Sequence, residues 1–416
     1  MKEAKFYPFD KIPIADTNWS LSTGPDRRIY TVACMELRGG GTATVVRYNS
    51  QEDQLEYLFD MGDVLNDRFD SGRATQCKIH YSFAPSEKEH IMYMATHLSA
   101  PAFGDILYSP WADWKDERKA FKGAGLVAFD TKHDEIRWSR IILPWEGCRC
   151  LALNDERDLI YLIGYPRNHF YVYDLKKDTL TDYGLLGAIN PQAIWLDQKR
   201  RAYTTDDYGR ILRFDPDKKR LEELDLYIPR SPYQNGWHSV VYDVVSAPDG
   251  EAIYGVPWRG QPHLFRHIPE DGPQGSLEDL GPATQMERDR QHAIGFFIDH
   301  VGGMVFGPDG MLYYVKSVWP GGEEMKWSQK PGWYLPLQIP LKGIVVRFNP
   351  KTNEKEDFAE LSVPNRIANY VSRAGMDQNG DLFFGHVGGR PPGIFKISMG
   401  YEKKIESKNF PLRFWG

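Results

Sequence analysis

Seven copies of one strand–turn–strand phrase predict that this 416-residue chain is an all-β protein, a seven-bladed β-propeller with four-stranded antiparallel blades around a central channel. Each copy has a turn, a short strand with Tyr or Phe near its end, a polar loop and a second strand ending near Asp or Asn. The composition agrees, because 38 Gly, 28 Pro and 13% aromatic residues favour short strands joined by tight turns. Long stretches with the apolar period of a helix are hard to find.

The copies follow one another along nearly the whole chain, which predicts a single domain over residues 1–416. They begin at Gly24, Ala84, Asn154, Leu196, Ala247, Gly307 and Asp377, and the second and sixth resume at Gly125 and Gly343. Division by seven gives about 59 residues per copy, against about 40–50 for a typical blade. The surplus lies in two insertions, 101–122 and 319–342. One chain end is expected to supply the strand that closes the ring. A set of β-sandwiches that does not close is the alternative, and the even spacing argues against it.

The charge balance excludes some classes of partner. Lys and Arg number 51 against 57 Asp and Glu, a net charge of −6, which disfavours nucleic acid. No apolar run reaches the length of a membrane span, so we expect no membrane partner. We also expect a monomer. The N-terminal residues lack the apolar core of a signal peptide. As written the chain is expected in the cytoplasm; a secreted or periplasmic protein whose leader was removed would read the same.

Four cysteines are too few for a disulfide scaffold at this length. Cys148 and Cys150 are one residue apart, which is not the spacing of a zinc site. We therefore expect both to be small buried residues.

The repeat also predicts where a site lies. In a propeller, the first strand of each blade lines the channel, and its start lies on the same face as the loop between the second and third strands. At or just before the first strands, the sequence places Trp19, His80, Arg149, Gln192, His238, His300 and Arg373. At the ends of the second strands it places Glu36, His97, Tyr165, Arg167, Asp206, Tyr208, Trp258, Arg259, Lys316 and His386. These side chains should converge on one pocket at what we call the channel mouth.

Both insertions leave from the same loop position and are aromatic, with Tyr108, Trp111 and Trp114 in the first and Trp319, Trp327, Trp333 and Tyr334 in the second. Aromatic rings beside cationic and imidazole groups suit a saccharide that carries a carboxylate. Singly, each residue also has a structural interpretation: a Tyr or Trp can pack between blades, and Arg149 or Arg373 can pair with a neighbouring acid. Asp130, Asp174 and Asp215 repeat in register and are expected to form turns.

His80 and His97 belong to one hairpin, KIHYSFAPSEKEHIMYMATH, whose length brings both imidazoles to the same end. Two adjacent imidazoles do not both readily carry a charge, so at least one should stay neutral near pH 7 and accept a proton. The alternative is a divalent metal site near the channel, with His238, His386 or Asp206 as a third ligand. No cofactor is otherwise required.

This hairpin, the following GLVAFD strand at Gly125 and the segment IYLIGYPRNHFYVYDL at Ile160 resemble the seven-bladed propeller polysaccharide lyases, a group that includes the ulvan lyases and the rhamnosyl-glucuronate lyases. The specific motifs cover about residues 76–174. The resemblance implies a site of two His, one Tyr and one Arg on one face of the ring. The two His fall on His80 and His97. The family's Tyr is expected where this chain reads Cys148-Arg149-Cys150, and its Arg where the chain reads Tyr165-Pro166-Arg167.

The chain thus departs from the family at the Tyr. Either Tyr165 substitutes for it while Arg149 or Arg167 takes the carboxylate, or the lyase chemistry has been lost. What the resemblance implies is cleavage of a uronic-acid-containing oligo- or polysaccharide by β-elimination. His80, His97, Tyr165 and Arg149 would be catalytic, and the substrate would be bound by Arg167, Tyr208, His238, Trp258, Arg259, Lys316, Arg373 and His386. The alternatives are a non-catalytic propeller that binds acidic glycans, a propeller glycoside hydrolase, and a metal-dependent lactonase.

Overall fold

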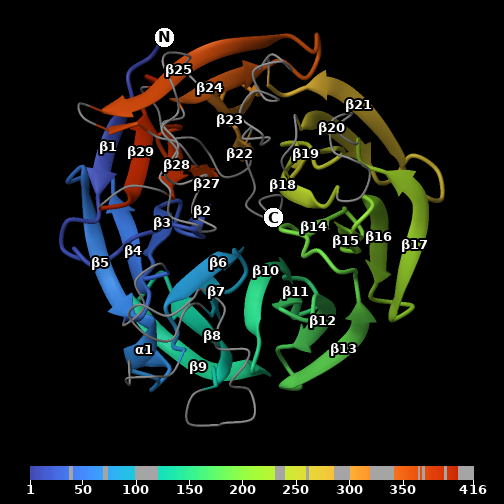
Figure 1. Cartoon of the computed structure of the whole chain (residues 1–416), viewed down its shortest axis with the longest axis horizontal. Coiled ribbons are helices and arrows are strands. Elements are labelled where there is room, and N and C mark those ends of the chain that lie inside the picture. The colour runs from blue at the N-terminus through green and yellow to red at the C-terminus, as the bar shows by residue number, and fades with distance from the viewer. Residues whose placement is uncertain are drawn as a thin grey trace, which may run out of the picture.

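A computed structural model describes most of the chain. The described residues are 1–36, 41–68, 74–98, 120–229, 239–258, 262–284, 300–318, 342–363, 366–367, 371–387 and 391–401. They form seven small antiparallel sheets arranged radially in a ring (Figure 1), so the predicted seven-bladed β-propeller is confirmed. One short helix, α1 (Met61–Val64), follows the first blade.

The blades follow one another in chain order. Blade 1 contains β2 (Leu21–Thr23), β3 (Ile29–Ala33), β4 (Thr44–Asn49) and β5 (Gln54–Asp60). Blade 2 contains β6 (Lys78–Ser86), β7 (Ile91–His97), β8 (Gly123–Asp130) and β9 (Glu135–Pro144). Blade 3 contains β10 (Gly147–Asn154), β11 (Leu159–Tyr165), β12 (His169–Asp174) and β13 (Thr179–Leu185). Blade 4 contains β14 (Trp195–Leu196), β15 (Ala202–Thr205), β16 (Arg210–Asp215) and β17 (Arg220–Tyr227).

Blade 5 contains β18 (Val241–Ser246), β19 (Ile253–Pro257), β20 (His263–Ile268) and β21 (Ser276–Pro282). Blade 6 contains β22 (His300–Phe306), β23 (Leu312–Val318), β24 (Lys342–Phe348), β25 (Lys355–Val363) and β26 (Arg366–Ile367). Blade 7 contains β27 (Val371–Met376), β28 (Leu382–His386), β29 (Gly393–Ile397) and β1 (Lys5–Pro8). Blade 6 therefore departs from the predicted four strands, because its chain turns back once more through the two-residue β26.

The N-terminal strand closes the ring, which confirms that a chain end supplies the last strand. β1 pairs antiparallel with β29, so the first ordered strand completes the last blade. Asp53, in the β4–β5 turn of blade 1, fastens this junction, since its carboxylate accepts hydrogen bonds from Tyr7, Tyr48 and Lys5.

The core lies between neighbouring blades, because both faces of each inner strand are covered. Between blades 1 and 2, for example, Tyr30 and Val45 pack with Met92 and Val127. All four cysteines are buried and free, as expected for small core residues. The three predicted turn-forming aspartates accept backbone N–H groups two and three residues on: Asp130 from Lys132 and His133, Asp174 from Lys176 and Lys177, and Asp215 from Asp217 and Lys218.

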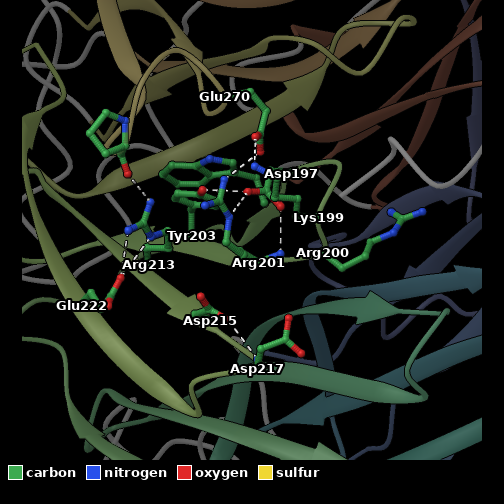
Figure 2. Close-up of polar contacts among 12 residues, drawn as sticks. Asp197, Lys199, Arg200, Arg201, Tyr203, Arg213, Asp215, Asp217, Glu222 and Glu270 are labelled. Carbon is green, nitrogen blue, oxygen red and sulfur yellow. Dashed lines mark hydrogen bonds and ion pairs between the residues drawn. The ribbon is translucent and has the colours of Figure 1, made fainter.

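Ion pairs link blades 4 and 5 at the end of the channel away from the mouth. Figure 2 shows Arg201 between Asp197 of its own turn and Glu270 of the next blade. Tyr203 donates a hydrogen bond to Asp197 over 2.8 Å. These contacts join the two blades, and Tyr203 among them packs edge-on against a buried imidazole, His267.

His267 is neutral in the folded protein, and this makes stability depend on pH. Trp195 Nε1 donates to its Nδ1 over 3.2 Å, while its Nε2 is buried and meets no hydrogen-bond partner in the described part of the chain. Burial, with Arg201 and Arg213 nearby, lowers the pKa of His267 to about 3. An unfolded chain would protonate this residue near pH 6.5. As pH falls from about 6.5 to about 3, only the unfolded state gains the proton, so stability should decline by up to about 1.4 kcal/mol per pH unit from this group.

The check is denaturant unfolding of the wild type and of His267→Gln across this window. Carboxylates titrate in both proteins, so their contribution cancels in the comparison. The free-energy difference between the two proteins should shift in favour of the variant as pH falls. A difference that stays constant with pH would contradict a neutral buried imidazole at this position.

Candidate functional site

Strand pairing brings the predicted positions to one end of the channel. Lys78 at the start of β6 pairs with His97 at the end of β7, and Gly147 of β10 pairs with Tyr165 of β11. The first insertion connects β7 to β8 and the second connects β23 to β24, as predicted. Their aromatic residues, Tyr108, Trp111, Trp114, Trp319, Trp327, Trp333 and Tyr334, lie outside the described residues.

β-Bulges interrupt five of the seven inner strands near the mouth. The register shifts after Ile79, Cys148, Val241, Gly302 and Val371. A bulge breaks the alternation of a strand and re-aims a side chain. The bulged positions include His80, Tyr81, Arg149, Tyr242 and Arg373. The sequence predicted His80, Arg149 and Arg373 as residues of the mouth, but it did not predict the bulges. At the corresponding position of β22, Gly303 has a φ of 67°, and a Cβ there would lie 2.7 Å from the Val371 side chain.

The two predicted histidines lie side by side. The ring centroids of His80 and His97 are 5.4 Å apart, and both side chains are about 1% exposed. Hydrogen-bond partners fix their tautomers: His80 Nδ1 lies 3.0 Å from the Arg149 carbonyl oxygen, and His97 Nδ1 lies 2.7 Å from the Leu98 carbonyl oxygen. Since a carbonyl oxygen only accepts, both Nδ1 atoms carry the proton when the rings are neutral. His97 Nε2 is then a lone-pair acceptor, and it has no hydrogen-bond partner among the described residues.

Burial and neighbouring cations keep both imidazoles neutral. Desolvation, followed by the charges of Arg149 and Lys78, holds the pKa of His80 well below 6.5. Desolvation, followed by the charges of Lys78 and Arg149, does the same for the pKa of His97. A neutral imidazole with an unused Nε2 can accept a proton at pH 7 but is poorly suited to donate one.

Tyr165 and Arg149 flank His97. The ring centroids of His97 and Tyr165 are 4.8 Å apart, and the Arg149 guanidinium lies 5.4 Å from the centre of the Tyr165 ring. The Tyr165 ring also packs against the small apolar cluster of Ala74, Leu98 and Phe121. Each of the four residues assigned to catalysis thus lies beside at least two of the others.

Sequence reasoning did not predict the ion pair behind this group. Lys78 and Glu36, both buried, form a salt bridge, and Glu36 also accepts a hydrogen bond from the Trp19 indole. Trp19 stacks on His80 with ring centroids 5.0 Å apart. Burial lowers the pKa of Lys78, which the Glu36 carboxylate partly opposes. No sequence signal marked Lys78, because its partner lies in another blade.

The cationic side chains near the mouth, which include the unpredicted Lys78, differ in the chemistry of their partners. Lys78 pairs with Glu36, Arg167 with Glu146, Lys316 with Asp357, and Arg373 with Asp243. Arg149 instead donates to the neutral amide of Gln192, with Nη2 2.8 Å from Oε1. Its Nε is buried without a hydrogen-bond partner, and no carboxylate among the described residues forms an ion pair with it.

Arg373 occupies the channel below this group. Its guanidinium lies 3.7 Å from the centre of the Tyr81 ring, pairs with Asp243 over 2.9 Å, and donates to the Gln192 carbonyl oxygen over 2.8 Å. Tyr81 and Tyr242 join hydroxyl to hydroxyl across the channel over 2.5 Å. These side chains come from blades 2, 4, 5 and 7 and form a floor. Beyond the floor, a cavity in the channel is lined by residues that include Ser22, Phe83, Leu151, Val245 and Met304.

The remaining predicted binding residues are dispersed. Lys316 pairs with Asp357 and Arg167 pairs with Glu146. His386 packs between Phe6 and Phe395. Tyr208 is 54% exposed in the β15–β16 loop, and Trp258 packs against the apolar cluster that contains Ile194 and Leu212. His238 and Arg259 lie outside the described residues.

Among the described residues, the one group of three or more His, Cys, Asp or Glu donors within 4.8 Å of one another is Asp130, His133 and Glu135. This group lies in the β8–β9 turn, at the opposite end of blade 2, and Arg137 already pairs with Asp130. His80 and His97 are not part of such a group in the described portion of the chain.

Comparison with known proteins supports the class of protein that the ring defines, a seven-bladed β-propeller, and nothing narrower. No family model matches the chain, and no curated protein matches it. Among solved structures, the extracellular domain of a one-component system from B. thetaiotaomicron is 13% identical with a TM-score of 0.56, covering 95% of this chain and 40% of that one. The present chain therefore spans less than half the length of that extracellular domain.

A streptogramin B lyase is 12% identical with a TM-score of 0.55, covering 95% of this chain and 96% of that one. The WD40 repeats of RRP9 are 9% identical with a TM-score of 0.53, covering 95% and 97%. At such identities the likeness concerns the fold alone, and the resemblance to polysaccharide lyases is supported only at that level. No helix within the described ranges is long and apolar enough to cross a bilayer.

Proposed function

We propose that the channel mouth binds a uronic acid unit of an acidic glycan and cleaves the glycan by β-elimination. The observation that carries this proposal is a neutral base beside an uncompensated cation. Within the described ranges, His97 Nε2 has no hydrogen-bond partner and Arg149 has no carboxylate partner. A ligand that carries both a carboxylate and an acidic C–H would satisfy both groups at once. The resemblance of the hairpin to the propeller lyases points to the same chemistry.

In this mechanism Arg149 neutralises the carboxylate, which makes the C5 proton removable because the developing enolate is stabilised. His97 Nε2 takes the C5 proton, the electron pair forms the C4=C5 double bond, and the C4–O bond breaks. Tyr165 supplies the proton to the leaving oxygen. His80, through its hydrogen bond to the Arg149 carbonyl, holds the backbone of the bulge that aims the guanidinium.

The assay is ultraviolet absorbance of the unsaturated uronate on incubation with ulvan, alginate, pectate and glucuronan. Because the pKa of His97 is held well below 6.5, the base remains deprotonated in mildly acidic solution. The acid limb of kcat/KM should therefore lie below pH 6.5 rather than at it. If the protein binds a uronate polymer but forms no unsaturated product from any of them, it is a glycan-binding module and not a lyase.

That second candidate has an observation in its favour. His97 is almost entirely buried, so a base at Nε2 requires the substrate to reach a site that solvent scarcely reaches. A binding module would need only Arg149 and aromatic rings at the rim, such as the half-exposed Tyr208. Product formation decides between the two, since a binder and a lyase share the Arg149 contact.

A further inference from the structure

Gln192 is held on both sides of its backbone and reaches into the mouth with its amide. Its N–H donates to the Val241 carbonyl of blade 5 over 3.0 Å, and its carbonyl accepts from Arg373 of blade 7 over 2.8 Å. Its side chain is 2% exposed, and Oε1 accepts from Arg149 of blade 3. Gln192 belongs to blade 4 and thus contacts three other blades. Blades 5 and 7 hold its backbone, and its side chain holds Arg149 of blade 3.

The chemistry of the partner matters as much as its position. Every other described cation at the inner strands and second-strand ends of the mouth (Lys78, Arg167, Lys316 and Arg373) is met by a carboxylate. A carboxylate would orient Arg149 equally well, but it would also neutralise the guanidinium and occupy donors that an anion needs. An amide oxygen takes one donor and leaves the charge, and Nε has no hydrogen-bond partner among the described residues.

We propose that Gln192 is the positioning and specificity-determining residue of the mouth: it orients the Arg149 guanidinium without compensating its charge, so that the site selects a uronate over a neutral sugar. This assignment rests on the proposed anionic glycan, but it requires binding only and not elimination. Arg373 supports it from the channel floor by holding the Gln192 carbonyl.

The direct test is Gln192→Glu, which keeps the shape and adds a carboxylate beside Arg149. The probes are a uronate tetrasaccharide from ulvan and the same tetrasaccharide after carboxyl reduction, with affinities measured by calorimetry. The internal ion pair should compete with the ligand, so affinity for the uronate should fall by about tenfold or more while affinity for the reduced sugar stays unchanged. Gln378→Glu is the control, because Gln378 bonds Ser50 in the turns at the other end of the channel and adds the same charge there.

Gln192→Met provides a second measurement that does not depend on a buried charge. It removes the hydrogen bond and leaves the guanidinium charged but less fixed. We expect kcat to fall more than KM rises, because the carboxylate contact tightens as the enolate forms. A role in stability alone would lower the melting temperature and leave the kcat-to-KM pattern of the folded fraction unchanged.

The outcomes separate this inference from the proposed function. A folded Gln192→Glu protein that still prefers the uronate tetrasaccharide as strongly as the wild type overturns the role of Gln192, even if the wild type is a lyase. If the wild type binds the uronate but makes no unsaturated product, and the Gln192→Glu variant loses that binding, the elimination chemistry fails and the role of Gln192 stands.

Discussion

Replacing His97 with Gln should lower the turnover of a uronate polymer by roughly 10²–10⁴-fold, the usual contribution of a general base. Gln keeps a polar side chain of similar reach but has no group that accepts a proton at neutral pH. The binding affinity for the polymer should change little, because Arg149 retains its charge. Turnover is measured as formation of unsaturated uronate, and affinity is measured separately by calorimetry.

The matched control is His133→Gln in the same blade. His133 is 53% exposed in the β8–β9 turn at the opposite end, where it pairs with Asp130. This change should leave turnover within twofold or so of the wild type. Equal turnover in His97→Gln and wild type would remove His97 from the mechanism. Thermal melts of both variants separate lost chemistry from lost folding.

Arg149→Gln should mainly reduce uronate binding and Arg373→Gln should mainly reduce stability, although both remove a guanidinium near the channel. Arg149 has no carboxylate partner within the described ranges, so its loss should abolish most uronate binding and cost little stability. Arg373 forms a buried pair with Asp243, and its removal strands a buried carboxylate, which costs about 3–5 kcal/mol in comparable cases. Calorimetric affinity and denaturant unfolding, measured on both variants, give the four values needed.

The result that would contradict this assignment is a large stability loss in Arg149→Gln with uronate binding intact. Arg149 would then be a structural link between blades 3 and 4. An Arg373→Gln protein as stable as the wild type would show that the floor of the channel tolerates an unpaired Asp243. Burial raises the pKa of Asp243, so the stranded carboxyl group is expected to be protonated more readily than an exposed one.

The sequence alone determined the architecture and the end of the ring at which a site can form. Repeats are a local property: each blade carries its own alternating strands and turns, so the number and order of blades can be counted. Antiparallel pairing then requires His80 and His97 to share one end of blade 2, whatever the other blades do. The same reasoning placed Arg149 and Tyr165 at the equivalent end of blade 3.

The tertiary structure decided which of these residues can act, because that depends on neighbours in other blades. Arg149 and Arg167 are equivalent candidates in the sequence, yet Glu146 compensates Arg167 while only the Gln192 amide meets Arg149. Lys78, Glu36 and the Arg373 floor rest on contacts between segments far apart in the chain. The bulges at His80, Arg149 and Arg373 were not predicted either, because where a strand takes up an extra residue depends on its pairing with the neighbouring strand.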